Sequence, residues 1–240
     1  MKLRMESETK QNNLFVPAAI VLAGALIGGA VYFGIRSSNG ANVFSPQGEE
    51  FTGDLEQMMP ITSEDHIRGN PNAPVIIVEY SDTECPFCKS FHPTMQRVME
   101  EYGDKVAWVY RHFPLDQIHS KADTEAEATE CAAELGGNAA FWKYLDRLFE
   151  VTPSNNNLDP AELPKIAQYV GLDVQEFNTC LASGKYAQHV ENETQNAVAT
   201  GGNGTPWSIV VAANGKKYPL SGAQPYEVVK QLIELALQEK

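Results

Sequence analysis

The alternation of apolar and polar residues predicts an α/β domain that begins near residue 63 and extends to residue 240. The apolar run Val75–Tyr80 is typical of a buried strand. From Phe87 to about Tyr102, apolar residues recur at spacings of three and four, which predicts an amphipathic helix. Val106–His112 predicts a second strand, and the Gly-, Asn- and Pro-containing stretch His66–Pro74 predicts a turn-rich lead into the first strand.

The pattern from Lys121 to Gly201 is almost wholly helical. Glycines, prolines and a capping aspartate divide it into five predicted helices. These are Asp123–Leu135, Ala139–Glu150, a helix that begins at Asp159 or Pro160 and ends at Gly171, a helix capped by Asp173 that ends near Gly184, and Tyr186–Thr200.

The last part of the chain predicts a hairpin followed by a helix. Strands Trp207–Ala212 and Lys217–Leu220 flank the turn Asn214-Gly215, and Pro225–Leu237 carries an apolar face at helical spacing. The order β-α-β, helical block, β-β-α predicts one α/β domain that is interrupted by a helical insertion at about residues 121–201.

A long uncharged segment precedes the predicted domain. Leu14–Ile35 holds 22 residues without a charge, and about 33 Å of helix matches the apolar core of a bilayer. The basic residues before this segment predict a cytoplasmic N-terminus (residues 1–13) and a domain on the extracytoplasmic, periplasmic side of the cell membrane. A cleaved signal peptide is the alternative, but the apolar stretch exceeds the usual length and no convincing cleavage site follows it. Residues 36–62 are mostly polar and predict a flexible tether.

Composition and charge narrow the range of partners. The chain is 43% hydrophobic and 20% charged, which is ordinary for a soluble globular domain. Its net charge is −13 and no basic cluster is present in the sequence, so nucleic acid is not an expected partner.

The most informative motif is Cys85-Pro86-Phe87-Cys88, which stands between the first predicted strand and the following helix. The positive end of the helix dipole favours a thiolate at Cys85, so Cys85 is predicted to be the nucleophile and the more buried Cys88 the resolving thiol. Half of a zinc site has the same spacing. The sequence holds no second CxxC or HxxxH, so neither a metal nor another cofactor is expected.

The other two cysteines, Cys131 and Cys180, stand 49 positions apart within the helical block. A structural disulfide between two helices is the favoured interpretation, and it would contribute about 4 kcal/mol by the chain-entropy estimate. Two free thiols or a second electron-relay pair are the alternatives, because spacing does not show that the sulfurs meet.

Four motifs make the chain, from about Ser63 to Lys240, resemble the DsbA-like thiol-disulfide oxidoreductases of the thioredoxin superfamily. They are Val78-Glu79-Tyr80-Ser81-Asp82-Thr83-Glu84-Cys85-Pro86-Phe87-Cys88, Arg111-His112-Phe113-Pro114, Ala140-Phe141-Trp142 and Gly204-Thr205-Pro206. The resemblance implies an α/β thioredoxin fold with a helical insertion, preceded here by one predicted transmembrane helix.

The resemblance also implies roles for residues outside the CxxC motif. Pro206 is expected to follow a cis peptide bond and, with Thr205, to present extended backbone to a client chain opposite the cysteines. Glu79 is expected to lie buried beneath the dithiol and to relay a proton, with the solvated side of the strand as the alternative. Asp82 and Glu84 are interpreted as loop residues without a catalytic role, and His92 as a packing or surface residue. His112 and His119, which follow a predicted strand, are expected to cover the edge of the active site without taking part in the chemistry.

These features favour an enzyme that introduces disulfides into exported proteins through a Cys85–Cys88 disulfide. Its expected partners are reduced or unfolded exported proteins and a quinone-linked membrane reoxidase, either DsbB-like or vitamin K epoxide reductase-like. The best-known donors of the family have histidine where Phe87 stands, and phenylalanine offers no cation to the thiolate, which predicts milder oxidising power. A membrane-tethered reductase or isomerase, and a thioredoxin-fold chaperone or binding module, are the alternatives.

Overall fold

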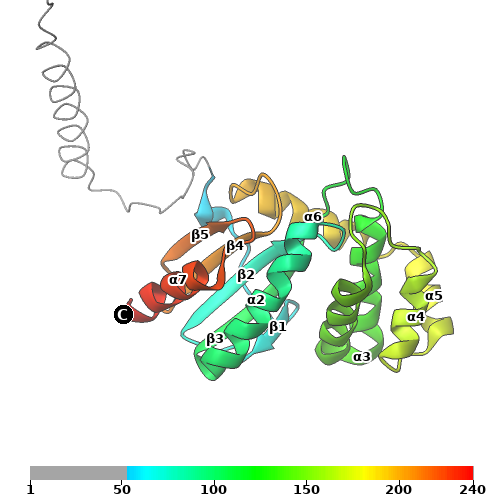
Figure 1. The fold of residues 1–240 in the computed structure, drawn as a ribbon, viewed down its shortest axis with the longest axis horizontal. Coiled ribbons are helices and arrows are strands. Elements are labelled where there is room, and N and C mark those ends of the chain that lie inside the picture. The colour runs from blue at the N-terminus through cyan, green and yellow to red at the C-terminus, as the bar shows by residue number, and fades with distance from the viewer. Residues whose placement is uncertain (1–52, 240) are drawn as a thin grey trace, which may run out of the picture. The chain divides into compact units, whose positions relative to one another are not determined.

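The centre of the fold is a five-stranded sheet in the order β1-β3-β2-β4-β5 (Figure 1). The computed structural model describes residues 53–239. Strands β2 and β3 run parallel, and the other neighbouring pairs run antiparallel. The strands are β1 (His66–Gly69), β2 (Val75–Ser81), β3 (Val106–His112), β4 (Trp207–Ala212) and β5 (Lys217–Ser221).

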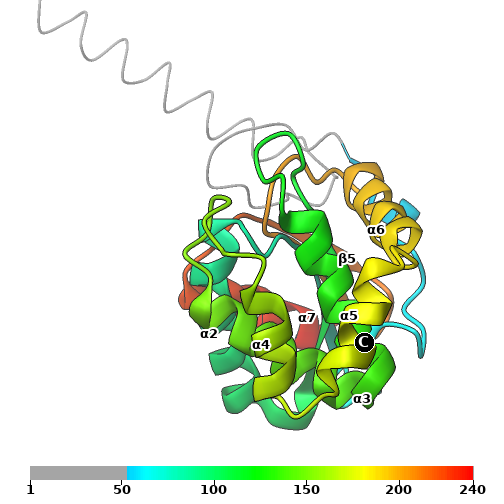
Figure 2. The same cartoon turned by 90° about the vertical axis from the view of Figure 1, so that its right-hand side faces the viewer.

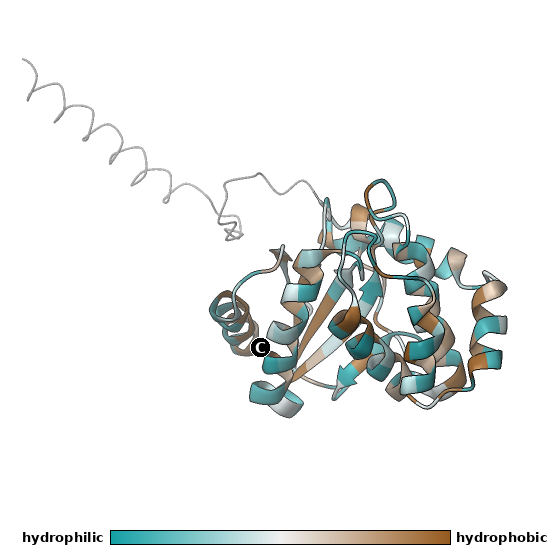
Figure 3. Ribbon diagram, turned by 45° about the vertical axis from the view of Figure 1, so that its right-hand side comes forward, coloured by the Kyte–Doolittle hydropathy of each residue, from teal (hydrophilic) through white to brown (hydrophobic). Residues whose placement is uncertain are grey.

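Helices cover both faces of the sheet, so its central strands are buried and apolar (Figure 3). α2 (Pro86–Tyr102) and α7 (Tyr226–Gln238) cover one face (Figure 1). Residues of α6 (Ala187–Ala199) pack on the other face. Alternate side chains of a strand point to opposite faces, so Ile77 joins the core beneath α2 and α7 while its neighbour Val78 joins the core beneath α6.

The helical insertion between β3 and β4 consists of α3 (Ala122–Val151), α4 (Glu162–Tyr169), α5 (Val174–Ala182) and α6. Helices α3, α4 and α5 lie together beside the sheet (Figure 2) and enclose a core of their own. α3 is kinked at Gly137, whose φ of +70° suits glycine. The backbone is not helical at Gly137, so the predicted boundary at Gly136-Gly137 is confirmed as the break between the two helical parts of α3.

The stretch from His66 to Gly69 is a strand, and the prediction of a turn there was wrong. His66 pairs with Tyr110 and Gly69 with Ala107, which makes β1 an antiparallel edge strand beside β3. Four residues are too few to show an apolar alternation, and this pairing depends on a strand some forty residues further along the chain.

The predicted tether is ordered over its described part. The side-chain amide of Asn196 in α6 donates to the carbonyl of Gln57 at 2.7 Å and accepts from the N–H of Met59 at 3.1 Å. Three apolar side chains of the segment pack against the core beneath α6, namely Leu55, Met58 and Ile61. The prediction of a flexible tether was therefore wrong for residues 53–62, and its remainder lies outside the described residues.

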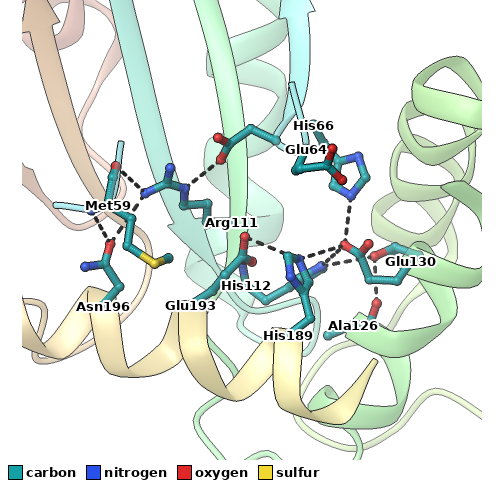
Figure 4. A network of polar contacts seen from close by, with 12 residues as sticks. Met59, Glu64, His66, Arg111, His112, Ala126, Glu130, His189, Glu193 and Asn196 are labelled. Atoms are coloured by element: carbon teal, nitrogen blue, oxygen red, sulfur yellow. Dashed lines mark hydrogen bonds and ion pairs between the residues drawn. The ribbon is translucent and has the colours of Figure 1, made fainter. Parts of the chain in front are cut away.

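Arg111 of β3 fastens this segment to the sheet (Figure 4). Its guanidinium donates to Asp65 at 2.8 Å and to the carbonyls of Met59 at 3.2 Å and Pro60 at 3.1 Å. Only 1% of Arg111 is exposed, so these partners compensate for the loss of water around its charge.

A buried carboxylate, Glu130 of α3, joins the insertion to the sheet (Figure 4). Its Oε1 lies 2.8 Å from Nε2 of His66 and 2.8 Å from Nε2 of His112. Burial acts to raise the pKa of Glu130, but the hydrogen bonds from His112 and His66 prevail and hold that pKa far below its usual range. At His112 burial acts to lower the pKa, and the contact with Glu130 raises it.

Within residues 53–239, no helix combines the length and the apolar composition needed to cross a membrane. The predicted membrane helix at residues 14–35 and the predicted cytoplasmic segment at residues 1–13 lie outside the described residues.

Candidate active site

Cys85 and Cys88 stand at the N-terminus of α2, close after the end of β2. Cys85 is the N-cap residue, and Pro86 suits the first helical turn because a proline leaves no backbone N–H unpaired there. Both cysteines are free thiols; Cys85 is 4% exposed and Cys88 is completely buried. Phe87 between them is 64% exposed. Of the two cysteines, only Cys85 has any surface exposed to solvent, which suits it to contact a client thiol first.

The surroundings move the pKa values of the two thiols apart. The hydrogen bond from Cys88 lowers the pKa of Cys85 to about 6, against the effect of burial and with help from Thr205 and from backbone N–H groups at the helix start. Burial raises the pKa of Cys88 well above its usual range, and its interaction with Cys85 adds to this effect. At neutral pH Cys85 is therefore a thiolate and Cys88 a thiol, as a nucleophile and a resolving residue require.

The loop before β4 faces Cys85. The Thr205-Pro206 peptide bond is cis, and the Cys85 thiol lies 3.5 Å from the carbonyl oxygen of Thr205. This loop places a backbone edge beside the nucleophile, where an extended client segment can form main-chain hydrogen bonds.

Glu79 of β2 is buried near Cys88. It is 1% exposed, and its Oε2 has no hydrogen-bond partner among the described residues. Burial raises the pKa of Glu79 to about 7, and nearby polar groups of Ser81 and Trp108 offset only part of this effect. The charge of Glu79 in turn raises the pKa of Cys88. Glu79 can therefore exchange its proton near neutral pH, and it interacts with Cys88, the thiol that must gain and lose a proton. The alternative of a solvated Glu79 is excluded by its burial.

Replacing Glu79 with glutamine is expected to stabilise the reduced protein at pH 8 and to change little at pH 4. Between 4.5 and about 7 the folded state binds more protons at Glu79 than the unfolded state does, so this residue reduces stability as the pH rises. The full penalty, present above about pH 7, is on the order of 3 kcal/mol. Urea unfolding of both proteins at the two pH values measures it, and an equal change at both would contradict a raised pKa.

Asp82, which was interpreted as a loop residue without a catalytic role, contacts both cysteines through its backbone. Its carbonyl accepts from the N–H of Cys85 at 3.1 Å, and its own N–H lies 3.4 Å from Sγ of Cys88. The ring of His119 binds its carboxylate at 2.7 Å, and both of these side chains are buried. His119 was expected at the edge of the active site, but its bond with Asp82 was not predicted, because no local signal connects the loop after β3 with the residues before the CxxC motif.

Glu84 is also buried, and it forms a carboxyl pair with Glu125 of α3. Burial and the hydrogen bond with Glu84 raise the pKa of Glu125 to about 9, so Glu125 is protonated at neutral pH. The hydroxyl of Thr83 donates to Glu125 at 2.7 Å. The pair depends on the docking of the insertion, which the local sequence does not reveal.

The other predicted residues lie apart from this chemistry. Cys131 of α3 and Cys180 of α5 form a disulfide, with their Cα atoms 5.8 Å apart. His92 of α2 is buried and binds Asp146 at 2.7 Å, so it has a packing role as expected. The described residues hold no group of three or more side chains suited to a metal ion.

Comparison with known protein families gives a match to the family described as thioredoxin over residues 62–235. Among solved structures, DsbA2 of Pseudomonas aeruginosa is 27% identical, with a TM-score of 0.64 over 75% of this chain and 99% of that one. α-DsbA1 of Wolbachia pipientis is 23% identical, with a TM-score of 0.65 over 76% and 94%. Oxidised BdbD of Bacillus subtilis is 23% identical, with a TM-score of 0.62 over 78% and 96%. The last two support the fold alone.

Curated relatives are named as Na⁺/H⁺ antiporters. NhaA 1 of Mycolicibacterium gilvum is 34% identical over 215 residues, which are 88% of this chain and 32% of that protein. NhaA 3 of Salinispora tropica is 35% identical over 167 residues, 69% of this chain and 24% of that protein. The chain thus spans a third or less of the length of these relatives, and their named activity belongs to the longer proteins.

Proposed function

This chain belongs to the thioredoxin family and is a DsbA-like thiol-disulfide oxidoreductase, and from that premise we propose that it introduces disulfides into exported proteins. The observation that supports the proposal best is the difference between the two thiols in pKa and in burial. Cys85 has a pKa of about 6 and is 4% exposed, whereas Cys88 is completely buried with a raised pKa. When the disulfide of such a pair takes up two electrons, Cys85 is left as a thiolate and Cys88 as a protonated thiol.

The proposed reaction begins with the oxidised Cys85–Cys88 disulfide. A client thiolate attacks Sγ of Cys85, the S–S bond breaks, and its electron pair goes to Cys88, which takes up a proton. The second client thiolate then attacks the client sulfur of the mixed disulfide, and Cys85 leaves as a thiolate. The client loses two electrons and two protons; the enzyme keeps both electrons and one proton, and the other proton goes to solvent. Glu79 is proposed to supply the proton to Cys88, because its pKa of about 7 allows it to do so.

The direction of the reaction is argued from the stability of the reduced state. A thiolate that is favoured at neutral pH stabilises the reduced enzyme, which makes its disulfide a stronger oxidant. The pKa of Cys85, about 6, falls between roughly 7 for thioredoxin and roughly 3.5 for DsbA. The reduction potential is therefore expected between about −270 mV and about −120 mV, the values of those two proteins.

The test is the equilibrium of the full-length protein with reduced and oxidised glutathione, followed by thiol trapping. A potential well above that of thioredoxin is expected and supports disulfide donation. A potential near about −270 mV would contradict the oxidase and favour a reductase, whose partner would be a membrane electron donor.

The proposed location is the extracytoplasmic side of the cell membrane, with an anchor at residues 14–35. The uncharged segment supports it, as do the antiporter relatives, whose names describe membrane transporters and whose chains contain a region similar to this one. Reoxidation then falls to a quinone-linked membrane protein of the DsbB-like or vitamin K epoxide reductase-like kind, and the clients are reduced exported proteins.

A further inference from the structure

The side chain of Asp82 is held by three donors beside the dithiol. Its carboxylate accepts from Nδ1 of His119 at 2.7 Å, from the N–H of Leu115 at 2.9 Å and from the N–H of Glu84 at 2.8 Å. Asp82 is 2% exposed and His119 is 4% exposed, so the bond between them is formed out of solvent. A carboxylate with these partners orients the imidazole and favours its protonated form.

The backbone of the same residue contacts both cysteines, through the N–H of Cys85 and Sγ of Cys88. The position of the His119 ring relative to Cys85 is thereby set by short, buried hydrogen bonds. Burial acts to lower the pKa of His119, but the bond with Asp82 raises it, and the negative charge of Cys85 raises it further. Because such an interaction is mutual, a protonated His119 must favour the thiolate of Cys85 to the same degree.

We propose that His119, held by Asp82, is the positioning residue that supplies positive charge to the Cys85 thiolate. This inference rests on the proposed function, since it assigns a cause to the stability of the reduced state. Phe87, between the two cysteines, is exposed and uncharged and cannot serve. The CxxC motif thus contains no cation that could stabilise the thiolate, and the loop after β3 supplies one.

The other ionisable groups around this site do not supply the charge. The pKa of Glu125, about 9, keeps that carboxyl protonated at neutral pH, and the proton of Glu79 is exchangeable near neutral pH. The ammonium group of Lys89, in the first turns of α2, is bound to the carbonyl of Thr152. Asp82 carries the opposite charge to His119 and reduces its effect on Cys85, so a moderate contribution is expected.

The consequence for the reaction concerns its second step. When the client disulfide forms, the Cys85–client S–S bond breaks and Cys85 leaves with the electron pair. A positive charge already in place stabilises that leaving thiolate without any movement of the protein. No further reactant is required, because the electrons come from the client thiols.

The experiment uses the full-length protein with His119→Gln, and it measures the ultraviolet absorbance of the Cys85 thiolate against pH. The acid dissociation constant of Cys85 is expected to fall about tenfold. The glutathione equilibrium is expected to move towards the oxidised form of the variant, because its reduced form loses a charge that stabilises the thiolate. His92→Gln is the matched control, because it also removes a buried histidine that is bound to an aspartate at 2.7 Å, and it is expected to change neither quantity. An unchanged Cys85 titration in a folded His119→Gln protein would overturn the inference.

A second measurement needs no substitution. In the wild-type protein, nuclear magnetic resonance titration of the His119 ring is expected to give a higher pKa in the reduced form than in the oxidised form, because the thiolate is present only in the reduced form. Equal values in both forms would overturn the inference even if the variant fails to fold. If the two values differ but the wild-type protein oxidises no client, His119 still acts on Cys85 and only the proposed function fails.

Discussion

Replacing Cys85 with serine is expected to abolish disulfide exchange completely while the fold persists. The serine hydroxyl is nearly isosteric with the thiol, but it is not ionised at neutral pH and forms no disulfide. The Cys85 side chain interacts with the Cys88 thiol and lies 3.5 Å from the carbonyl of Thr205, and a hydroxyl can make both contacts. Oxidation of a reduced model peptide, together with a thermal unfolding curve, measures both parts of this expectation.

The matched control is Cys88→Ser, which leaves the nucleophile and removes the resolving thiol. It is expected to accumulate a mixed disulfide between Cys85 and the client, visible on a non-reducing gel and lost on reduction. Residual exchange in Cys85→Ser would show that another thiol reacts. If both variants promote client folding as well as the wild type does, the thioredoxin-fold binding module is the better function.

Removing the Cys131–Cys180 disulfide with a double alanine substitution is expected to lower the free energy of unfolding by about 4 kcal/mol. The bond joins α3 to α5 across 49 positions and so restricts a long loop of the unfolded chain. Both half-cystines are buried in the core of the insertion, beside residues such as Phe177 and Leu148. Denaturant unfolding of the wild-type and variant proteins measures the loss.

Single alanine substitutions at Cys131 and Cys180 separate the effect of the bond from that of the lost side chains. Each is expected to destabilise the protein almost as much as the double substitution, because each alone removes the whole cross-link. The glutathione equilibrium of Cys85 and Cys88 is expected to stay unchanged in all three variants. A loss below about 1 kcal/mol would contradict a stapling role, and a changed equilibrium would support an electron relay instead.

Most helices and strands could be predicted because their signals lie in consecutive residues. β4 has the predicted bounds, and α7 begins and ends one residue later than predicted. Asp173 caps α5 through its side chain, which accepts from two backbone N–H groups of the first turn. β1 escaped prediction because its pairing with β3 is not encoded in its four residues.

The candidate site was predictable only in the part that its motifs carry. The CxxC motif marked Cys85 and Cys88, and the resemblance marked Glu79 and the Thr205-Pro206 bond. Asp82 was interpreted as a loop residue, and His119 as a residue that covers the edge of the active site without a chemical role, because nothing in the order of residues shows that the two side chains meet.

By itself the sequence determined an α/β domain with a helical insertion and the positions of the two thiols, because periodicity, capping residues and a short motif are local properties. The thioredoxin fold followed from the family resemblance that four motifs carry. The tertiary structure alone decided the surroundings of those thiols. It buried Glu79 and Cys88, joined His119 to Asp82, and paired Glu84 with Glu125. A pKa depends on burial and on neighbouring charges within a few ångströms, and in this protein those neighbours come from segments that only folding brings together.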